Sequence, residues 1–161
     1  MSGLKPAHWA ALRALLARLD SQEGLVWALT GSTSFALQGM AVIVHDIDLI
    51  SDRAGAYRIG ALLADSCVRP VKPSQARFIR SHFGQFVLAG VDLDLMGDPR
   101  RRAMDGTWGR PVALPPLIQW VEAAGLKLPV LSLRFEEQAY RLLRRPARAD
   151  AIAAFLRQAE G

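Results

Sequence analysis

The stretch from Thr30 to Ser51 reads TGSTSFALQGMAVIVHDIDLIS and contains two acidic residues, Asp46 and Asp48, inside an apolar segment. Residues 42–44 are Val-Ile-Val and residues 49–50 are Leu-Ile, a β-branched composition that predicts a buried strand. Side chains two residues apart on a strand project from the same face, so both carboxylates are expected on one face. Two buried carboxylates repel each other and lose hydration, and a pair of divalent metal ions would compensate both effects. The stretch therefore predicts a metal-dependent site for phosphate chemistry.

A second acidic strand is predicted at residues 91–96, Val-Asp-Leu-Asp-Leu-Met. Asp92 and Asp94 alternate with apolar residues, so both lie on one face of this strand. If the strand lies beside the first acidic strand, one of these acids reaches the same metal ions. Asp94 lies deeper in the apolar run and is the preferred third acid, whereas Asp92 either orients it or lies at the mouth of the strand.

The turn at Gly31 and Ser32 is predicted to bind phosphate. A glycine lets backbone N–H groups approach a phosphate closely, and the N-terminus of the helix that follows favours anions. The serine hydroxyl adds one more hydrogen-bond donor, and Ser32 or Thr33 is expected to cap this helix.

The composition limits the class of protein. The chain has 161 residues, of which 51% are hydrophobic and 22% charged, and is expected to form one globular domain with a core at about 1–114 and a helical part at about 115–161. No apolar run approaches the ~18–20 residues that a membrane span needs, and the N-terminus lacks a signal-peptide core, so a cytoplasmic protein without a membrane partner is expected. The single cysteine, Cys67, excludes an internal disulfide and a cysteine-based zinc cluster. The net charge of +5 favours anionic partners without identifying them.

The periodicity of apolar residues predicts an α+β fold, a mixed sheet flanked by helices with a helical element at the C-terminus. Besides the two acidic strands, the expected strands are 25–29, 76–80, 83–89 and 107–114. The expected helices are 6–20, 53–65, 117–124 and two near the C-terminus, around 135–143 and 152–159. Pro70 and Pro73 are expected to mark an irregular crossing.

The Gly31-Ser32 turn, thirteen intervening residues and then Asp46-Ile47-Asp48 resemble the signature of the nucleotidyltransferase superfamily, which has a DNA polymerase β-like fold. The third acid on a later strand belongs to the same signature, and the resemblance covers roughly residues 25–96. The chain is more similar to the small bacterial stand-alone members, which include antibiotic nucleotidyltransferases and toxin–antitoxin nucleotidyltransferases.

This resemblance implies the transfer of a nucleoside monophosphate from an NTP to an acceptor, with release of pyrophosphate. It implies that Gly31 and Ser32 hold the β- and γ-phosphates and that Asp46 and Asp48 bind two Mg²⁺ (or Mn²⁺) ions. Asp94 would ligate the metal that activates the acceptor hydroxyl or help to remove its proton. The acceptor stays open: it is a small molecule, a protein or an RNA end.

Arginines are the least informative residues of the sequence. Arg77 and Arg80 precede the second acidic strand and either contact the nucleotide or lie on a solvated face. The groups at 100–102 and 141–148 either form a surface for an anionic substrate or nucleic acid or, as is usual for such runs, form solvated faces with salt bridges. The aromatic residues are not interleaved with these arginines in a recognisable stacking platform.

Three other hypotheses remain at this point. The first is a nucleotide-binding or toxin–antitoxin-type regulatory module of the same fold, with little or no turnover and a small helical protein partner. The second is a metal phosphoesterase built on His45, Asp46 and Asp48, although strand alternation turns His45 away from both acids. The third is a nucleic-acid-binding protein without chemistry, which would rest on charge alone.

Overall fold

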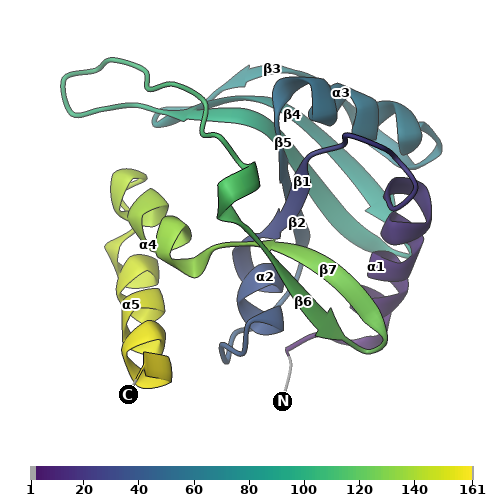
Figure 1. Ribbon diagram of the computed structural model, residues 1–161. Coiled ribbons are helices and arrows are strands. Elements are labelled where there is room, and N and C mark those ends of the chain that lie inside the picture. Colours follow the sequence, from purple (N-terminus) through teal and green to yellow (C-terminus); the bar gives the residue numbers. More distant parts are fainter. Residues whose placement is uncertain (1–2, 161) are drawn as a thin grey trace.

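The computed structural model describes residues 3–160, which form one seven-stranded sheet with helices on both sides (Figure 1). The order of the strands across the sheet is β3-β4-β5-β2-β1-β7-β6. The strands are β1 (Trp27–Thr30), β2 (Ile47–Ser51), β3 (Cys67–Gln75), β4 (Ile79–Leu88), β5 (Val91–Arg101), β6 (Ile118–Ala123) and β7 (Leu126–Leu131). The α-helices are α1 (Pro6–Leu19), α2 (Gly31–Leu37), α3 (Arg53–Leu62), α4 (Leu133–Leu142) and α5 (Pro146–Glu160), and two short 3₁₀ turns are η1 (Ala64–Ser66) and η2 (Pro115–Leu117).

The sheet is mixed, as the sequence predicts. The acid-bearing strand β2 lies at its centre, parallel to β5 on one side and antiparallel to β1 on the other. The β1 strand is in turn parallel to β7, and the remaining neighbours are antiparallel. The two acidic strands are therefore direct neighbours, which was the condition for a shared site.

The two faces of the sheet have different coverings. Helices α1 and α3 pack on the face that carries Ile47, Leu49, Leu93 and Leu95, all at most 1% exposed. Because side chains alternate along a strand, Asp48 and Asp94 project from the opposite face. On that side, α5 packs against α2 through Ile152 and Phe35, and Figure 1 shows α4 and α5 on the side of the sheet away from α1 and α3.

Several expectations about individual elements are wrong. The acidic strand is shorter than predicted and begins at Ile47, so Asp46 lies just before it. The stretch with Pro70 and Pro73 is the strand β3, which tolerates proline because it is an edge strand. No strand forms at 107–114, where only Trp108 makes an isolated bridge to Arg102.

The expected helix at 117–124 is instead the strand β6. It forms a hairpin with β7 through Ala124 and Gly125, whose φ angles are +50° and +77°. Two consecutive positive φ angles are typical of a tight hairpin turn. Residues 118–123 form a strand and not the expected helix because they pair with the apolar strand β7. The sheet therefore extends to Leu131, and the helical C-terminal element consists of α4 and α5. None of the described helices is both long and apolar enough to cross a membrane.

Leu93 provides a test of this core. It is fully buried on β5 between β2 and β4, under the helices α1 and α3. We expect Leu93→Ala to lower the free energy of unfolding by about 2–5 kcal/mol, because it leaves a cavity in a packed interior. Ile43→Ala is the matched control, since Ile43 is 75% exposed and should change stability by less than about 0.5 kcal/mol. Urea unfolding of both variants measures the difference, and equal losses would contradict this packing.

Candidate active site

Asp48 and Asp94 lie side by side at the centre of the sheet. They are register partners in the parallel pair β2–β5, so their Cα atoms are separated by about one strand spacing, roughly 5 Å. On its other side Asp94 pairs with Gln85 of β4, whose side-chain amide donates a hydrogen bond of 3.0 Å to the Asp94 carboxylate. Asp94 therefore lies directly beside Asp48, and the hydrogen bond from Gln85 fixes the orientation of the Asp94 carboxylate.

Asp46 and Asp92 lie at the same end of these two strands. Both are exposed, and they precede the first paired residues of β2 and β5, Ile47 and Leu93. Asp46, Asp92 and Asp94 line a cavity of about 240 Å³ together with Gln85. The structure therefore brings all four predicted acids to one place, with Asp94 paired to Asp48 and Asp92 nearer to solvent.

The site carries unbalanced negative charge. Burial and the neighbouring carboxylates of Asp94 and Asp46 together raise the pKa of Asp48 to about 6, against the opposing effect of Arg148 of α5. A bound cation would relieve this repulsion, and a set of carboxylate oxygens suits Mg²⁺ or Mn²⁺. Within residues 3–160, no three acidic, histidine or cysteine side chains converge closely enough to hold a metal ion as they stand. The donor chemistry therefore fits a divalent ion, and a full set of ligands requires side-chain adjustment.

Gly31 is constrained by Asp48 as well as by its own backbone. Its φ angle is +67°, and a Cβ atom at this position would lie 2.5 Å from Asp48 Oδ2. Only glycine permits both the left-handed conformation and this close approach. Ser32 is half-buried and lies inside α2, which begins at Gly31 without a side-chain cap, so the expected capping by Ser32 or Thr33 is wrong.

Glu136 of α4 is a site residue that the sequence analysis missed. Its side chain is 2% exposed, and Oε1 accepts hydrogen bonds from the Gly31 backbone N–H (3.0 Å) and from the Thr30 hydroxyl. Its other oxygen, Oε2, is buried without a hydrogen-bond partner. The pKa of Glu136 is raised to about 8, mainly by burial and to a smaller extent by nearby Asp48, although the two hydrogen bonds and Arg148 act to lower it. The Gly31 N–H predicted to contact phosphate is therefore paired with a carboxyl group.

A sequence signal for Glu136 existed. The buried face of α4 carries Leu133, Glu136 and Ala139, three residues at helical spacing. A glutamate on an apolar helical stripe is unusual, because a charged side chain is rarely buried without a partner. That signal identifies a candidate but not its partner, since Gly31 is distant in the sequence.

Arg77 and Arg80 do not lie beside the acids. Arg77 precedes β4 and Arg80 lies near its start, where it pairs with Arg100, whereas Asp94 pairs with Gln85 further along the strand. Their role in nucleotide binding remains a prediction. Arg148 interacts electrostatically with both Asp48 and Glu136, and Arg101 also interacts with Glu136.

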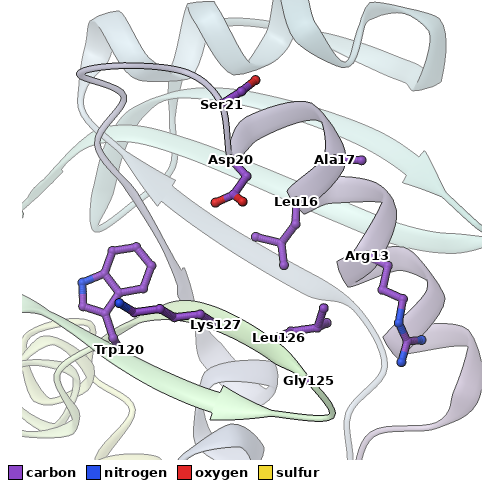
Figure 2. A pocket seen from close by; sticks show the side chains of 9 residues that line it. All are labelled: Arg13, Leu16, Ala17, Asp20, Ser21, Trp120, Gly125, Leu126 and Lys127. Atoms are coloured by element: carbon purple, nitrogen blue, oxygen red, sulfur yellow. The ribbon is translucent and has the colours of Figure 1, made fainter.

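A larger cleft, about 750 Å³, lies elsewhere, between α1 and the β6–β7 hairpin (Figure 2). Its charged and aromatic lining residues are Arg13, Asp20, Trp120 and Lys127. It contains none of the predicted site residues, and the hairpin forms the edge of the sheet opposite β3. Choosing the site by cavity volume alone would therefore select this cleft and miss the cavity beside the acidic residues.

A matched pair of variants separates the two constraints on Gly31, which are its left-handed backbone and its close approach to Asp48. Gly24 has the same kind of backbone, with φ +71°, but a Cβ atom added there would have no neighbour within 4 Å. We expect Gly24→Ala to cost about 1–2 kcal/mol of stability from backbone strain alone. Gly31→Ala should cost more, because the methyl group also collides with Asp48. Chemical unfolding measures both, and an equal loss in the two variants would contradict the close approach.

Glu136 predicts a pH dependence of stability. Between its ordinary pKa of 4.5 and the raised value of about 8, the folded protein keeps a proton that the unfolded chain has released. Stability should therefore fall as pH rises, by at most about 1.4 kcal/mol per pH unit. Asp48 contributes only below about pH 6, so the window from pH 6 to 8 isolates Glu136.

The matched variant is Glu136→Gln, which keeps an oxygen acceptor for Gly31 and Thr30 but does not titrate. Its free energy of unfolding should change less between pH 6 and 8 than that of the unmodified protein. Parallel slopes for the two proteins would show that Glu136 is ionised in the folded state.

Comparisons with known proteins identify the family and the fold. The model of the aminoglycoside-2''-adenylyltransferase family matches residues 11–153. A crystal structure from Thermotoga maritima, of a protein to which nucleotidyltransferase activity has been attributed, shares 41% sequence identity with a TM-score of 0.84, over 96% of both chains. The structure of ANT(2'')-Ia in complex with adenylyl-2''-tobramycin shares the fold, with a TM-score of 0.50 and 15% identity over 93% of this chain and 97% of that one. No curated protein matches the sequence.

The match covers most of the chain, including both acidic strands and α4, so the family extends beyond the motif that first indicated it. The protein belongs to the aminoglycoside-2''-adenylyltransferase family and, with it, to the nucleotidyltransferase superfamily.

Proposed function

We propose that this protein is a metal-dependent nucleotidyltransferase that moves a nucleoside monophosphate from an NTP to an acceptor hydroxyl. The observation that carries the proposal is the pairing of Asp48 with Asp94 across β2 and β5, with Asp46 at the same end of the strands. Membership of a nucleotidyltransferase family supports the same reaction class.

Asp46, Asp48 and Asp94 are the residues that would hold Mg²⁺ or Mn²⁺. When bound, such ions supply charge neutralisation for the triphosphate and lower the pKa of the acceptor hydroxyl. Asp48 and Asp94 are register partners at the centre of the sheet and Asp46 directly precedes β2, and both strands pack against α1 and α3 on the opposite face. A rigid sheet is a suitable support, because phosphoryl transfer depends mainly on positioning.

In the proposed reaction the acceptor oxygen attacks the α-phosphorus and the bond to the bridging oxygen of the β-phosphate breaks. Pyrophosphate leaves with that electron pair, and the acceptor proton passes to the Asp94 carboxylate. The hydrogen bond from Gln85 orients Asp94 for this role. Gly31 and Ser32 would hold the β- and γ-phosphates, and the Arg148 guanidinium would offset the developing negative charge.

A second candidate is a nucleotide-binding or toxin–antitoxin-type regulatory module of the same fold with little turnover. The contact between Glu136 and the Gly31 N–H favours it, because this donor is already occupied. Titration calorimetry with NTP and Mg²⁺ discriminates the two: binding without pyrophosphate release over a panel of acceptors would support the regulatory module.

The catalytic assignment is tested by removing one charge at a time. We expect Asp48→Asn and Asp94→Asn to reduce pyrophosphate release by at least about 100-fold, because each removes a charged group that acts on the reacting atoms. Without metal, Asp48→Asn should also stabilise the fold by about 1–2 kcal/mol at pH 8, since it removes a buried like charge.

Asp20→Asn is the matched control, because Asp20 lines the separate cleft of Figure 2. It should leave pyrophosphate release unchanged. Asp92→Asn distinguishes the two candidates for the third acid and should retain most of the turnover. Full turnover in Asp94→Asn would contradict the assignment of the third acid.

A further inference from the structure

Three segments that are distant in the sequence bring arginines onto aromatic rings at one end of the molecule. At the start of β4, the guanidinium of Arg77 lies 5.0 Å from the centre of the Phe78 ring, and Arg144, from the turn between α4 and α5, lies 4.4 Å from the same ring. Arg80 and Arg102 lie 4.5 and 5.9 Å from the ring of Trp108, in the loop after β5. We call these six residues the arginine-aromatic surface.

The long loop after β5 is part of this arrangement. In Figure 1 it extends beyond the end of the sheet, over the ends of α4 and α5. Arg144 connects the two regions, because its guanidinium also contacts Met104 Sδ in this loop at 3.1 Å. The interleaving of arginine and aromatic side chains therefore arises from tertiary contacts, which explains why the linear sequence shows no stacking platform.

The four arginines of this surface are not neutralised by carboxylates. In the part of the chain that the structure describes, none of them forms an ion pair. Arg80 donates to the Gln75 side chain and Arg102 to the Gly106 carbonyl, both neutral acceptors. Arg141 on α4, in contrast, is paired with Glu137 and Asp150. The expectation of salt-bridged faces thus holds for Arg141 and is wrong for Arg102 and Arg144.

The surface is connected to the acids through α5. Arg148 lies in the first turn of α5, four residues after Arg144 of the turn that precedes this helix, and its charge acts on Asp48. Arg145 and Arg148 lie 5.5 and 5.4 Å from the ring of Tyr140. One short segment therefore supplies Arg148, whose charge acts on Asp48, and Arg144, which lies on the ring of Phe78.

We propose that the acceptor is the hydroxyl end of a single-stranded nucleic acid, which lies along the arginine-aromatic surface with its terminal hydroxyl at Asp94. This inference rests on the proposed function and names the class of its acceptor. Guanidinium groups bind backbone phosphates, and unpaired bases stack on aromatic rings and on guanidinium planes. The terminal hydroxyl supplies the attacking oxygen, its proton passes to Asp94, and pyrophosphate is the leaving group.

The charge of the surface argues against a cationic acceptor. ANT(2'')-Ia has been solved with adenylyl-2''-tobramycin, and an aminoglycoside carries several protonated amines. Four arginines without carboxylate partners would repel such a molecule and attract a polyanion. The same fold would then act on an acceptor of opposite charge.

Binding is tested with a 20-nucleotide single-stranded RNA of mixed sequence that carries a 5′ fluorescein and a free 3′ hydroxyl. Fluorescence anisotropy between 50 and 300 mM KCl should give an affinity that falls steeply with salt. Phe78→Ala should weaken binding by about 5- to 150-fold through the loss of stacking. Arg144→Gln should reduce the slope of log affinity against log salt by about 0.7.

The opposite edge of the sheet offers matched controls. Lys127 lies 5.3 Å from the ring of the exposed Trp120, so this pair has the same chemistry far from β4 (Figure 2). Trp120→Ala and Lys127→Gln should leave RNA affinity unchanged. Thermal melting shows that each variant is folded, and Arg144→Gln keeps the test valid if Phe78→Ala unfolds.

Transfer is tested with a mixture of the four α-³²P-labelled NTPs, Mg²⁺, and the RNA or a DNA of the same sequence. Label at the 3′ end of either strand is the expected result, and Asp48→Asn should bind the RNA without labelling it. Absence of RNA binding at 50 mM KCl, or label in added tobramycin in place of nucleic acid, would overturn the inference. Pyrophosphate release without RNA binding rejects this acceptor alone, whereas Phe78-dependent RNA binding without any pyrophosphate release rejects the proposed reaction.

Discussion

The parallel pairing of β2 with β5 places the carboxylates of Asp48 and Asp94 beside each other in the middle of the sheet. Two like charges at one strand spacing, partly removed from water, are unfavourable for the fold without a ligand, and the raised pKa of Asp48 expresses this cost. Apolar packing compensates for it: Ile47, Leu49, Leu93 and Leu95 alternate with the acids and are buried under α1 and α3. The apolar packing on one face of the sheet thus stabilises the strands that carry the acidic residues on the other face.

The C-terminal helices complete the site. Through Glu136, α4 binds the turn at Gly31, and through Arg148, α5 supplies the cation that faces Asp48. The turn itself is shaped by a close approach, because Asp48 occupies the space where any side chain at position 31 would lie. Gly31 therefore connects three groups: the acidic strand, the buried glutamate and the helix α2 that begins there. The conformation of this turn and the packing of α4 are therefore linked through the hydrogen bond between Gly31 and Glu136.

Family membership indicates the reaction class and the fold, whereas the chemistry of the surface indicates which acceptor could bind. The family model and the Thermotoga maritima structure agree on the reaction class and the fold. The acceptor depends on residues outside the shared motif, because a fold is a support on which different sites are built. The arginine-aromatic surface carries guanidinium groups on aromatic rings, and its chemistry differs from what a polycationic acceptor requires.

The sequence by itself determined the mixed sheet flanked by helices, the superfamily and the four candidate acids. It could do so because strand alternation and motif spacing are local properties that survive in any arrangement of the remaining chain. It did not determine that residues 118–123 form a strand, since that depends on the partner β7. It also left open which acid pairs with Asp48, where Glu136 binds and how the arginines reach their aromatic rings. These were decided by the tertiary structure, because each is a contact between segments distant in the chain, and such contacts leave no periodic trace in the sequence.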